Sequence, residues 1–161
     1  MAVIRINDIC LIKATLSDRK GRTEGNPFRV LALPKTMSLY ELADAIIASF
    51  DFDLDHAFGF YDNIMHYPRS REAYELFAEM RCESGFSDVR KTRIFKAFPV
   101  INKKMLLVFD YDAGWRFIVE LVGTEEKPSD SAYPKIVESS GIAPRQYTTT
   151  DMEDNENGDK A

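Results

Sequence analysis

Cysteine and histidine are scarce in this sequence of 161 residues, which contains two of each. Cys10 lies in an apolar, strand-like run, and Cys82 lies near the end of a helical pattern. Their spacing is that of neither a zinc site nor a redox motif, so we expect buried free thiols. No spacing joins His56 and His66 in one site either. These residue types therefore give no support for a metal or redox centre.

Long apolar runs are also missing, as are a glycine-rich phosphate loop and the Gly-x-Ser-x-Gly turn of a nucleophile elbow. The apolar run at residues 105–109 is far too short to span a bilayer. Arg5 and Asp8 lie where a signal peptide would need its apolar stretch. We therefore predict a cytoplasmic protein with no membrane segment, and we predict no cofactor.

An excess of positive charge is absent, because the formal net charge is −5 at pH 7. Five carboxylates and one lysine in residues 151–161 account for −4 of it, so the rest of the chain is nearly neutral. An acidic segment with almost no apolar residues cannot offset its ordering entropy by burial. We predict a disordered acidic tail over residues 148–161, after a single domain over residues 1–147.

Apolar residues are plentiful enough for one sizeable core, since 45% of the sequence is hydrophobic and 12% is aromatic. Strand patterns cover residues 9–16, 28–33, 57–61, 105–111 and 115–122, and helical patterns cover residues 39–50, 69–82 and 90–98. Ser38 with Glu41 is a capping box that starts the best-defined helix. We predict an α+β fold with an antiparallel or mixed sheet of five to six strands, two to three helices and a β-grasp-like N-terminal half.

Two segments carry recognisable motifs: residues 109–117 read FDYDAGWRF, and residues 133–147 begin with YPKIVE and end with APRQY. Together with the Pro-x-Arg strand at residues 27–29 and the Thr-x-x-Leu-x-x-Leu helix start at residues 36–42, they resemble the plasmid pRiA4b ORF-3-like family over residues 9–147. The members of this family are mostly uncharacterised and often encoded on plasmids and mobile elements. The resemblance implies a fold but no activity.

The residues that carry the family signature lie in these two segments. They are Asp110, Tyr111, Trp115, Tyr133, Pro134, Pro144 and Tyr147. The chain also departs from the pattern, because Asp112 and Ala113 replace the Gly and second Asp of the family's Tyr-Asp-Phe-Gly-Asp-x-Trp hairpin. Phe117 stands where many relatives have a histidine, and Arg145 and Gln146 replace two acidic residues. These departures remove polar groups that an enzyme would use.

A hydrolase-like site is one alternative, with His56 as a general base beside the carboxylates of Asp110 and Glu120. The structural interpretation is that a backbone carbonyl holds a buried histidine. In that interpretation Asp110 fixes the hairpin turn near Gly114. No residue in the sequence is marked as a nucleophile, so an enzyme is the less favoured alternative.

Alternating carboxylates at Asp51, Asp53 and Asp55, followed by Asp62, resemble a calcium-binding loop. His56 occupies the position where that loop needs glycine, and Asp62 replaces its bidentate glutamate. The sequence therefore favours a solvated loop over a metal site.

A basic run has no carboxylate between residues 89 and 109. It consists of Arg90, Lys91, Arg93, Lys96, Lys103 and Lys104. Interleaved with Phe95 and Phe98, these cations form a candidate contact for phosphate backbones. The structural alternative is a solvated helix face.

The favoured function is a non-enzymatic binding or interaction module with a protein partner. A nucleic-acid-associated accessory protein of a mobile element is the first alternative, and the hydrolase-like enzyme is the second. A bare sheet edge or an exposed apolar patch would favour the protein partner. A contiguous basic face would favour nucleic acid, and a cleft that joins Asp110, Glu120 and His56 would favour the enzyme.

Overall fold

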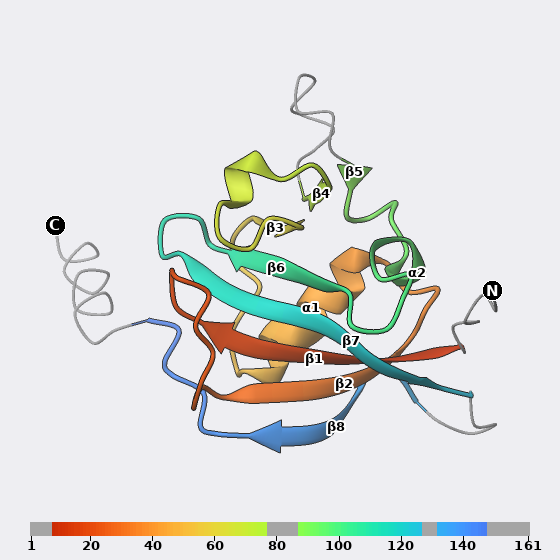
Figure 1. The fold of residues 1–161 in the computed structure, drawn as a ribbon. Coiled ribbons are helices and arrows are strands. Elements are labelled where there is room, and N and C mark those ends of the chain that lie inside the picture. The colour runs from red at the N-terminus through yellow and green to blue at the C-terminus, as the bar shows by residue number, and fades with distance from the viewer. Residues whose placement is uncertain (1–7, 77–86, 127–131, 148–161) are drawn as a thin grey trace, which may run out of the picture.

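The computed structural model describes residues 8–76, 87–126 and 132–147, and within them the chain forms one mixed sheet with helices packed on it (Figure 1). In chain order the elements are β1 (Ile9–Ser17), β2 (Phe28–Pro34), α1 (Leu39–Ser49), β3 (Phe58–Tyr61), the 3-10 turn η1 (Tyr67–Arg69), β4 (Ala73–Glu75), β5 (Ser87–Asp88), α2 (Ile94–Ala97), β6 (Lys104–Phe109), β7 (Trp115–Glu125) and β8 (Lys135–Ser140). The eight strands lie in the order β5-β4-β3-β6-β7-β1-β2-β8.

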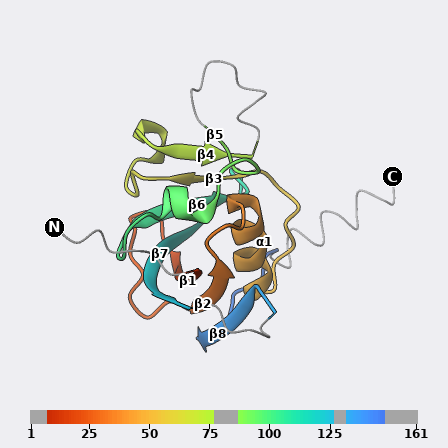
Figure 2. The ribbon, with the colours of Figure 1, turned by 90° about the vertical axis from the view of Figure 1, so that its right-hand side faces the viewer.

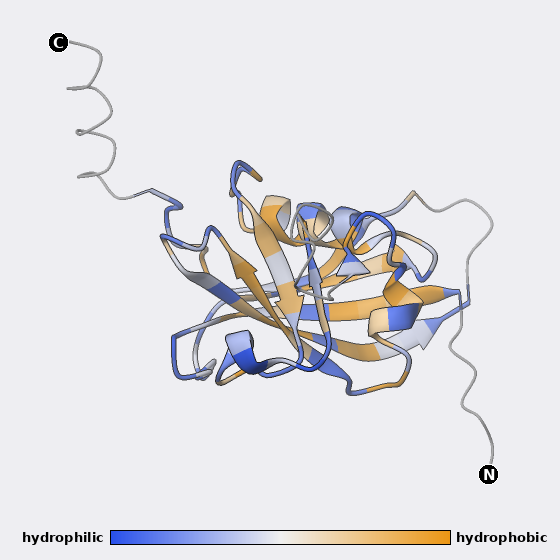
Figure 3. Ribbon diagram, turned by 90° about the horizontal axis from the view of Figure 1, so that it is seen from above, coloured by the Kyte–Doolittle hydropathy of each residue, from blue (hydrophilic) through white to orange (hydrophobic). Residues whose placement is uncertain are grey.

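Strand β1 lies inside the sheet, where it pairs antiparallel with β2 and with β7. Strands β6 and β7 form the predicted hairpin, in which Phe109 lies opposite Trp115. All pairings are antiparallel except that of β4 with β5, so the sheet is mixed. Apolar residues are concentrated in the central strands, and polar residues on the connections between them (Figure 3). The alternation of side chains along a strand thus directs one set of apolar residues to each face.

Helix α1 covers one face of the sheet (Figure 2). The predicted capping box starts it, because the Ser38 hydroxyl accepts from the backbone N–H of Glu41 and the Glu41 carboxylate accepts from the backbone N–H of Ser38. The apolar residues at helical spacing then point at the sheet: Leu39, Leu42, Ala43, Ile46 and Ile47 are all buried. The short helix α2 adds Ile94 and Ala97 to the same core.

The opposite face carries a smaller cluster, made of Tyr61, Ala73, Leu106 and Val108. Tyr67 of η1 packs against this cluster, and so does Tyr111, whose hydroxyl lies 2.8 Å from that of Tyr61. The connection from β3 to β4, which includes η1, therefore packs on the sheet face opposite α1.

Two sequence predictions need correction. The sheet has eight strands in the described residues, more than the five to six predicted, because β4, β5 and β8 are short segments without a clear alternating pattern. The helix predicted over residues 69–82 is wrong in its described part. Residues 73–75 instead form β4, whose side chains are all buried, so pairing with β3 overrides helical spacing. Residues 77–82, with Cys82, lie outside the described residues.

The strand, strand, helix, strand order of the N-terminal half is as predicted, and its β-grasp-like character stays a prediction. In the sheet β6 and β7 lie between β1 and β3. The predicted tail, residues 148–161, lies outside the described residues, so its disorder stays a prediction. No helix in the described ranges is long and apolar enough to cross a membrane.

Candidate functional site

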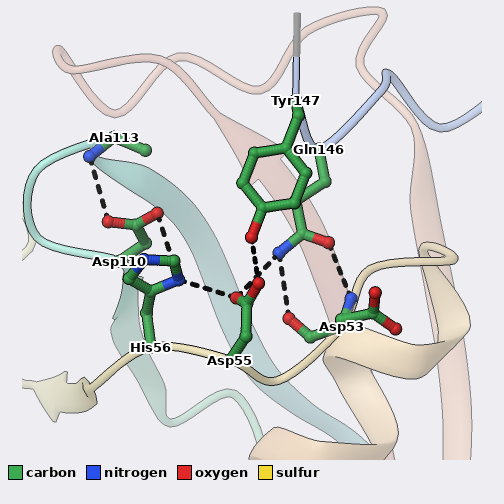
Figure 4. A network of polar contacts seen from close by, with 7 residues as sticks. All are labelled: Asp53, Asp55, His56, Asp110, Ala113, Gln146 and Tyr147. Carbon is green, nitrogen blue, oxygen red and sulfur yellow. Dashed lines mark hydrogen bonds and ion pairs between the residues drawn. The ribbon is translucent and has the colours of Figure 1, made fainter. Parts of the chain in front are cut away.

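A polar network ties the segment after β8 to the loop that precedes β3 (Figure 4). The side-chain amide of Gln146 bonds the backbone of Asp53 twice: Nε2 donates to the carbonyl oxygen at 2.9 Å, and Oε1 accepts from the N–H at 2.7 Å. Nε2 also lies 3.2 Å from Oδ1 of Asp55. The side-chain amide of Gln146 therefore bonds both backbone groups of Asp53, as a paired strand residue would. These bonds hold the segment after β8 against the loop before β3.

Asp55 joins this segment to His56 and Tyr147. The Tyr147 hydroxyl donates to Oδ2 of Asp55, and Nδ1 of His56 lies 2.6 Å from Oδ1. The same Nδ1 lies 3.5 Å from Oδ2 of Asp110. Asp110 is buried and follows β6, and its Oδ1 accepts from the backbone N–H of Ala113 at 3.2 Å. The network thus connects the β6–β7 turn, the loop before β3 and the C-terminal segment.

The contacts in the network shift the pKa values of His56, Asp55 and Tyr147 in compatible directions. The hydrogen bond to Asp55 raises the pKa of His56 above its ordinary value, and the charges of Asp110, Asp55 and Asp112 act in the same direction against partial desolvation. Desolvation is the largest single influence on Asp55, but hydrogen bonds from Tyr147 and His56 outweigh it and lower the pKa of that carboxyl. The bond to Asp55 raises the pKa of Tyr147 to about 12. Each pKa direction favours a protonated tyrosine and a cationic histidine around an ionised carboxylate.

The structure brings together two members of the predicted hydrolase-like trio, His56 and Asp110, but not the third. Glu120 lies opposite Lys104 at the far end of the β6–β7 hairpin, roughly 16 Å along the strands at about 3.3 Å per residue. The hollow of about 480 Å³ beside the network is lined by Phe50, Asp51, Asp53 and residues 142–147. Nδ1 of His56 contacts the carboxylates of Asp55 and Asp110. We call the network the clasp, because it ties three segments of the chain together; its residues are Asp53, Asp55, His56, Asp110, Gln146 and Tyr147.

The acidic loop does not assemble a ligand set. Across residues 8–76, 87–126 and 132–147, no group of three His, Cys, Asp or Glu side chains is placed to hold a metal ion. The Asp53 backbone bonds Gln146, the Asp55 carboxylate bonds His56 and Tyr147, and Asp51 adopts a positive φ of 59°. Oδ1 of Asp62 accepts instead from the backbone N–H groups of Arg71 and Glu72.

The basic run is divided between two places. Arg90, Lys91, Arg93 and Lys96 are exposed around α2, beside the exposed Phe95. The guanidinium groups of Arg90 and Arg93 contact the Tyr40 ring and the Thr36 carbonyl oxygen, respectively.

The other two cations lie near carboxylates. Lys103 forms an ion pair with Glu72 at 2.7 Å, and Lys104 lies opposite Glu120. Because Met105 points into the core beneath α1, Lys104 points to the other face. The six cations therefore do not form one contiguous face.

Strand β8 forms one edge of the sheet (Figures 1 and 2). Among the described residues it pairs only with β2, and all six of its residues are exposed. Ile136 and Val137 have exposed fractions of 52% and 47%, which is unusual for two adjacent aliphatic residues in a strand. Within the described ranges, no strand pairs with the outer row of backbone N–H and C=O groups of β8, so this row can accept another strand.

An apolar groove runs between β8 and α1. Its floor is Leu31, one wall is formed by Ala45, Ala48 and Ser49, and the other by Pro134, Lys135 and Ile136. Its volume of about 210 Å³ is below the roughly 300 Å³ at which small-molecule pockets begin. The groove is therefore suited to a side chain of a bound segment.

Arg29 holds the inner side of this edge. Although only 7% exposed, its guanidinium donates to the carbonyl oxygens of Ser49 at 3.0 Å, Ser140 at 3.0 Å and Gly141 at 3.1 Å. It also lies over the Phe50 ring, 4.7 Å from the centroid. One buried cation thereby fastens the end of α1 and the end of β8 to β2, and carbonyl oxygens at a helix C-terminus favour a cation.

Sequence reasoning missed the residues of this edge as a site. Ile136 and Val137 were quoted only as part of a motif, and the alanines of α1 give no signal before α1 and β8 are placed side by side. Of the signature residues, Pro134 lines the groove and Tyr147 closes the clasp. Pro144 lines the hollow beside the clasp, and Trp115 packs on Phe52 with ring centroids 4.8 Å apart.

Fold and edge together define an α+β protein of one mixed sheet with an open, partly apolar edge. A family model described as plasmid pRiA4b ORF-3-like protein matches residues 11–148, so the chain belongs to this family and the sequence resemblance is confirmed. No curated protein matches the sequence.

The fold is similar to that in the crystal structure of a protein of unknown function from Methanosarcina mazei Go1. The TM-score is 0.70 at 15% sequence identity, over 97% of this chain and 83% of that one. At this identity the likeness shows the fold alone.

Proposed function

We propose that this protein is a non-enzymatic interaction module that binds an extended segment of a protein partner by strand addition at β8. The observation that carries the proposal is the six-residue edge, exposed at every position, beside the apolar groove under α1. In strand addition the main-chain hydrogen bonds supply affinity, and pockets for alternate side chains supply specificity. Here β8 offers the main-chain groups, and the groove offers a pocket.

The chemistry of the groove sets the chemistry of the segment. Leu31, Ala45, Ala48 and Ile136 line it with carbon, so the side chain that enters it is aliphatic or aromatic. Lys135 and Glu138 are exposed at the two ends of the apolar pair, which favours a segment with a carboxylate and a cation at matching positions. The partner is therefore an extended segment with an apolar residue between charged ones.

The two alternatives have less support. The four cations around α2 with Phe95 keep a nucleic-acid contact as the second candidate, but Lys103 and Lys104 lie apart from them beside carboxylates. The enzyme alternative loses Glu120 from its trio, and His56 does not line the hollow beside the network. A cytoplasmic location and a role in mobile elements stay predictions.

A peptide library tests the proposal. Random twelve-residue peptides displayed on phage are selected on the full chain, and the winners are synthesised and titrated against two variants of α1. Ala48→Arg fills the groove from the helix surface, and the matched control Ala48→Ser keeps it open. We expect selected peptides with alternating apolar residues, at least tenfold weaker binding to Ala48→Arg, and unchanged binding to Ala48→Ser.

Hydrogen exchange then maps the bound peptide, and residues 135–140 are expected to gain protection. Two results would overturn the proposal: a library from which nothing is enriched, or peptides that protect residues 53–56 or 90–96 and leave β8 unchanged.

A further inference from the structure

The charge pattern of β8 indicates which kind of strand can pair with it. Its first four residues are Lys135, Ile136, Val137 and Glu138, a cation and an anion on either side of an apolar pair. Read from Glu138 back to Lys135, the pattern begins with the anion and ends with the cation, and the apolar pair stays in the centre. An antiparallel neighbour with the same sequence therefore places each lysine near a glutamate.

The bulge in β8 puts the two charges on the same face of the sheet. In the pairing with β2, Lys135 lies opposite Ala32 and Glu138 opposite Val30, with a register shift at Val137. Ala32 and Val30 are two residues apart, so Lys135 and Glu138 share one face. In a regular strand, residues three apart would point to opposite faces.

Ile136 occupies the other face. It lies opposite Leu31, whose side chain belongs to the core under α1, and it lines the groove. When two β8 strands pair about a two-fold axis that passes between Ile136 and Val137, the lysine of each copy lies opposite the glutamate of the other. Ile136 of each copy then lies opposite Val137 of the other.

The other neighbouring registers lack this match. Shifting the second strand by one residue in either direction places Lys135 opposite Val137 or Ser139 of the second copy, and Glu138 then has no cation opposite. Opposite charges in cross-strand pairs stabilise a sheet, while like charges destabilise it. Neither Lys135 nor Glu138 forms an ion pair with a described residue in its own chain. The Lys135 ammonium lies over the Tyr133 ring, 5.4 Å from the centroid, so a second copy would offer it its first carboxylate partner among the described residues.

We propose that the segment bound at β8 is β8 of a second copy of this chain, paired antiparallel with Lys135 opposite Glu138. The proposal rests on the proposed function, because it requires that β8 accepts a strand. A six-residue edge contributes far less than the roughly 1,600 Å² of a standard interface, so the dimer is weak and depends on protein concentration. The paired copies share one continuous sheet, with both α1 helices on the same side.

Charge reversal tests the register with the full chain. Sedimentation velocity over a concentration series is measured for the wild type, for K135E and for E138K. Each single variant puts like charges opposite one another in its own dimer, so each is expected to stay monomeric where the wild type dimerises. A one-to-one mixture of the two variants restores opposite charges at both ends and is expected to dimerise. The double variant K135E/E138K is expected to dimerise by itself.

Both side chains are exposed, so the variants fold, and urea unfolding checks that they do. The proposal is overturned if the wild type is monomeric up to millimolar concentration, or if its dimer survives both reversals. If the wild type is monomeric while library peptides still bind β8, the proposed function stands and the self-pairing is wrong. If neither dimer nor peptide binding occurs, the proposed function has failed as well.

Discussion

The two edges of the sheet differ in length and in surroundings. Strand β5 has two residues, and the main chain of its buried Asp88 is held by the Thr92 hydroxyl at 2.9 Å as the chain turns towards α2. Strand β8 has six residues, all exposed, with two adjacent aliphatic side chains and a groove beside them. Both edges end the same sheet, yet β8 alone offers a strand-length row of exposed backbone.

This difference is informative because an open edge is a hazard that proteins normally remove. Very short edge strands, inward charges and bulges are the usual devices. The β5 edge is short and carries a buried carboxylate. The β8 edge has six residues. Its lysine and its bulge do not prevent pairing, but they limit the strands that can pair with it. We therefore interpret β8 as a binding edge and β5 as a protected one.

The largest effect is expected from Arg29→Met, which removes the cation under β8. The carbonyl oxygens of Ser49, Ser140 and Gly141 would lose their donor in a buried place. We expect a loss of about 3 kcal/mol in the free energy of unfolding, measured by urea titration. Hydrogen exchange should quicken at β8 and stay unchanged at β5. The control Arg90→Met, at an exposed position, should cost less than about 0.5 kcal/mol, and an equal loss in both would show that Arg29 does not hold the edge.

A smaller effect is expected from Gly141→Ala, just after β8. Gly141 has φ +82°, and an added Cβ would lie 2.9 Å from Cα of Pro27. Strain and contact together predict a loss of about 2 kcal/mol, again by urea unfolding. Gly25→Ala is the matched control, because φ is +74° there but nothing lies within 4 Å of the new Cβ. Equal losses at the two glycines would mean that Pro27 yields and that the close approach is unimportant.

His56→Gln is expected to have a small, pH-dependent effect on the clasp. The pKa of His56 is raised above its ordinary 6.5 in the folded state, chiefly by the bond to Asp55, and Asp110 and Asp112 also face it. Its stabilising contribution is therefore complete below pH 6.5 and is lost as the pH rises through the raised value. Because the side chain is 43% exposed, we expect a few tenths of a kcal/mol at most.

Unfolding of wild type and variant at pH 5.5 and pH 9 measures this difference. It should be present at the lower pH and absent at the higher one. His66→Gln, at the other histidine and outside the network, serves as the matched control. A difference that grows towards pH 9 would contradict the assignment.

The smallest effect is expected from neutralising Arg90, Lys91, Arg93 and Lys96 together. These side chains surround α2, away from β8, so peptide binding and dimerisation should be unchanged. Titration of the same phage-selected peptides and sedimentation of the variant check this. A loss of peptide binding would move the contact from the sheet edge to α2. A salt-dependent affinity of the wild type for single-stranded DNA, lost in this variant, would promote the second candidate.

The sequence predicts the parts of the fold that local signals control. The Ser38 and Glu41 capping box, the apolar face of α1 and the hairpin after Asp110 each depend on neighbouring residues, and each is present. Strand β4 was mistaken for a helix because its three residues are buried by pairing with β3, which residue spacing does not encode. Strand β8 was not predicted as a strand because its six residues show no clear alternating pattern of apolar and polar side chains.

The candidate site was harder to predict than the fold. The clasp joins His56 to Asp55, its neighbour in sequence, but it also needs Asp110, Gln146 and Tyr147 from distant segments. The Arg145 and Gln146 departure from the family pattern was interpreted as a loss of chemistry, whereas Gln146 bonds the loop through both ends of its amide. The groove and the exposed edge depend on how α1 and β8 pack beside each other, and a single sequence does not show that packing.

The most direct test of strand addition is hydrogen exchange of the backbone amides of residues 135–140 in dilute wild-type protein, with and without a saturating phage-selected peptide. The account predicts that amides of β8 become protected when the peptide binds, while those of β5 exchange at the same rate in both samples. Peptide binding that leaves the β8 amides as fast as before would contradict the claim that this edge is the binding site.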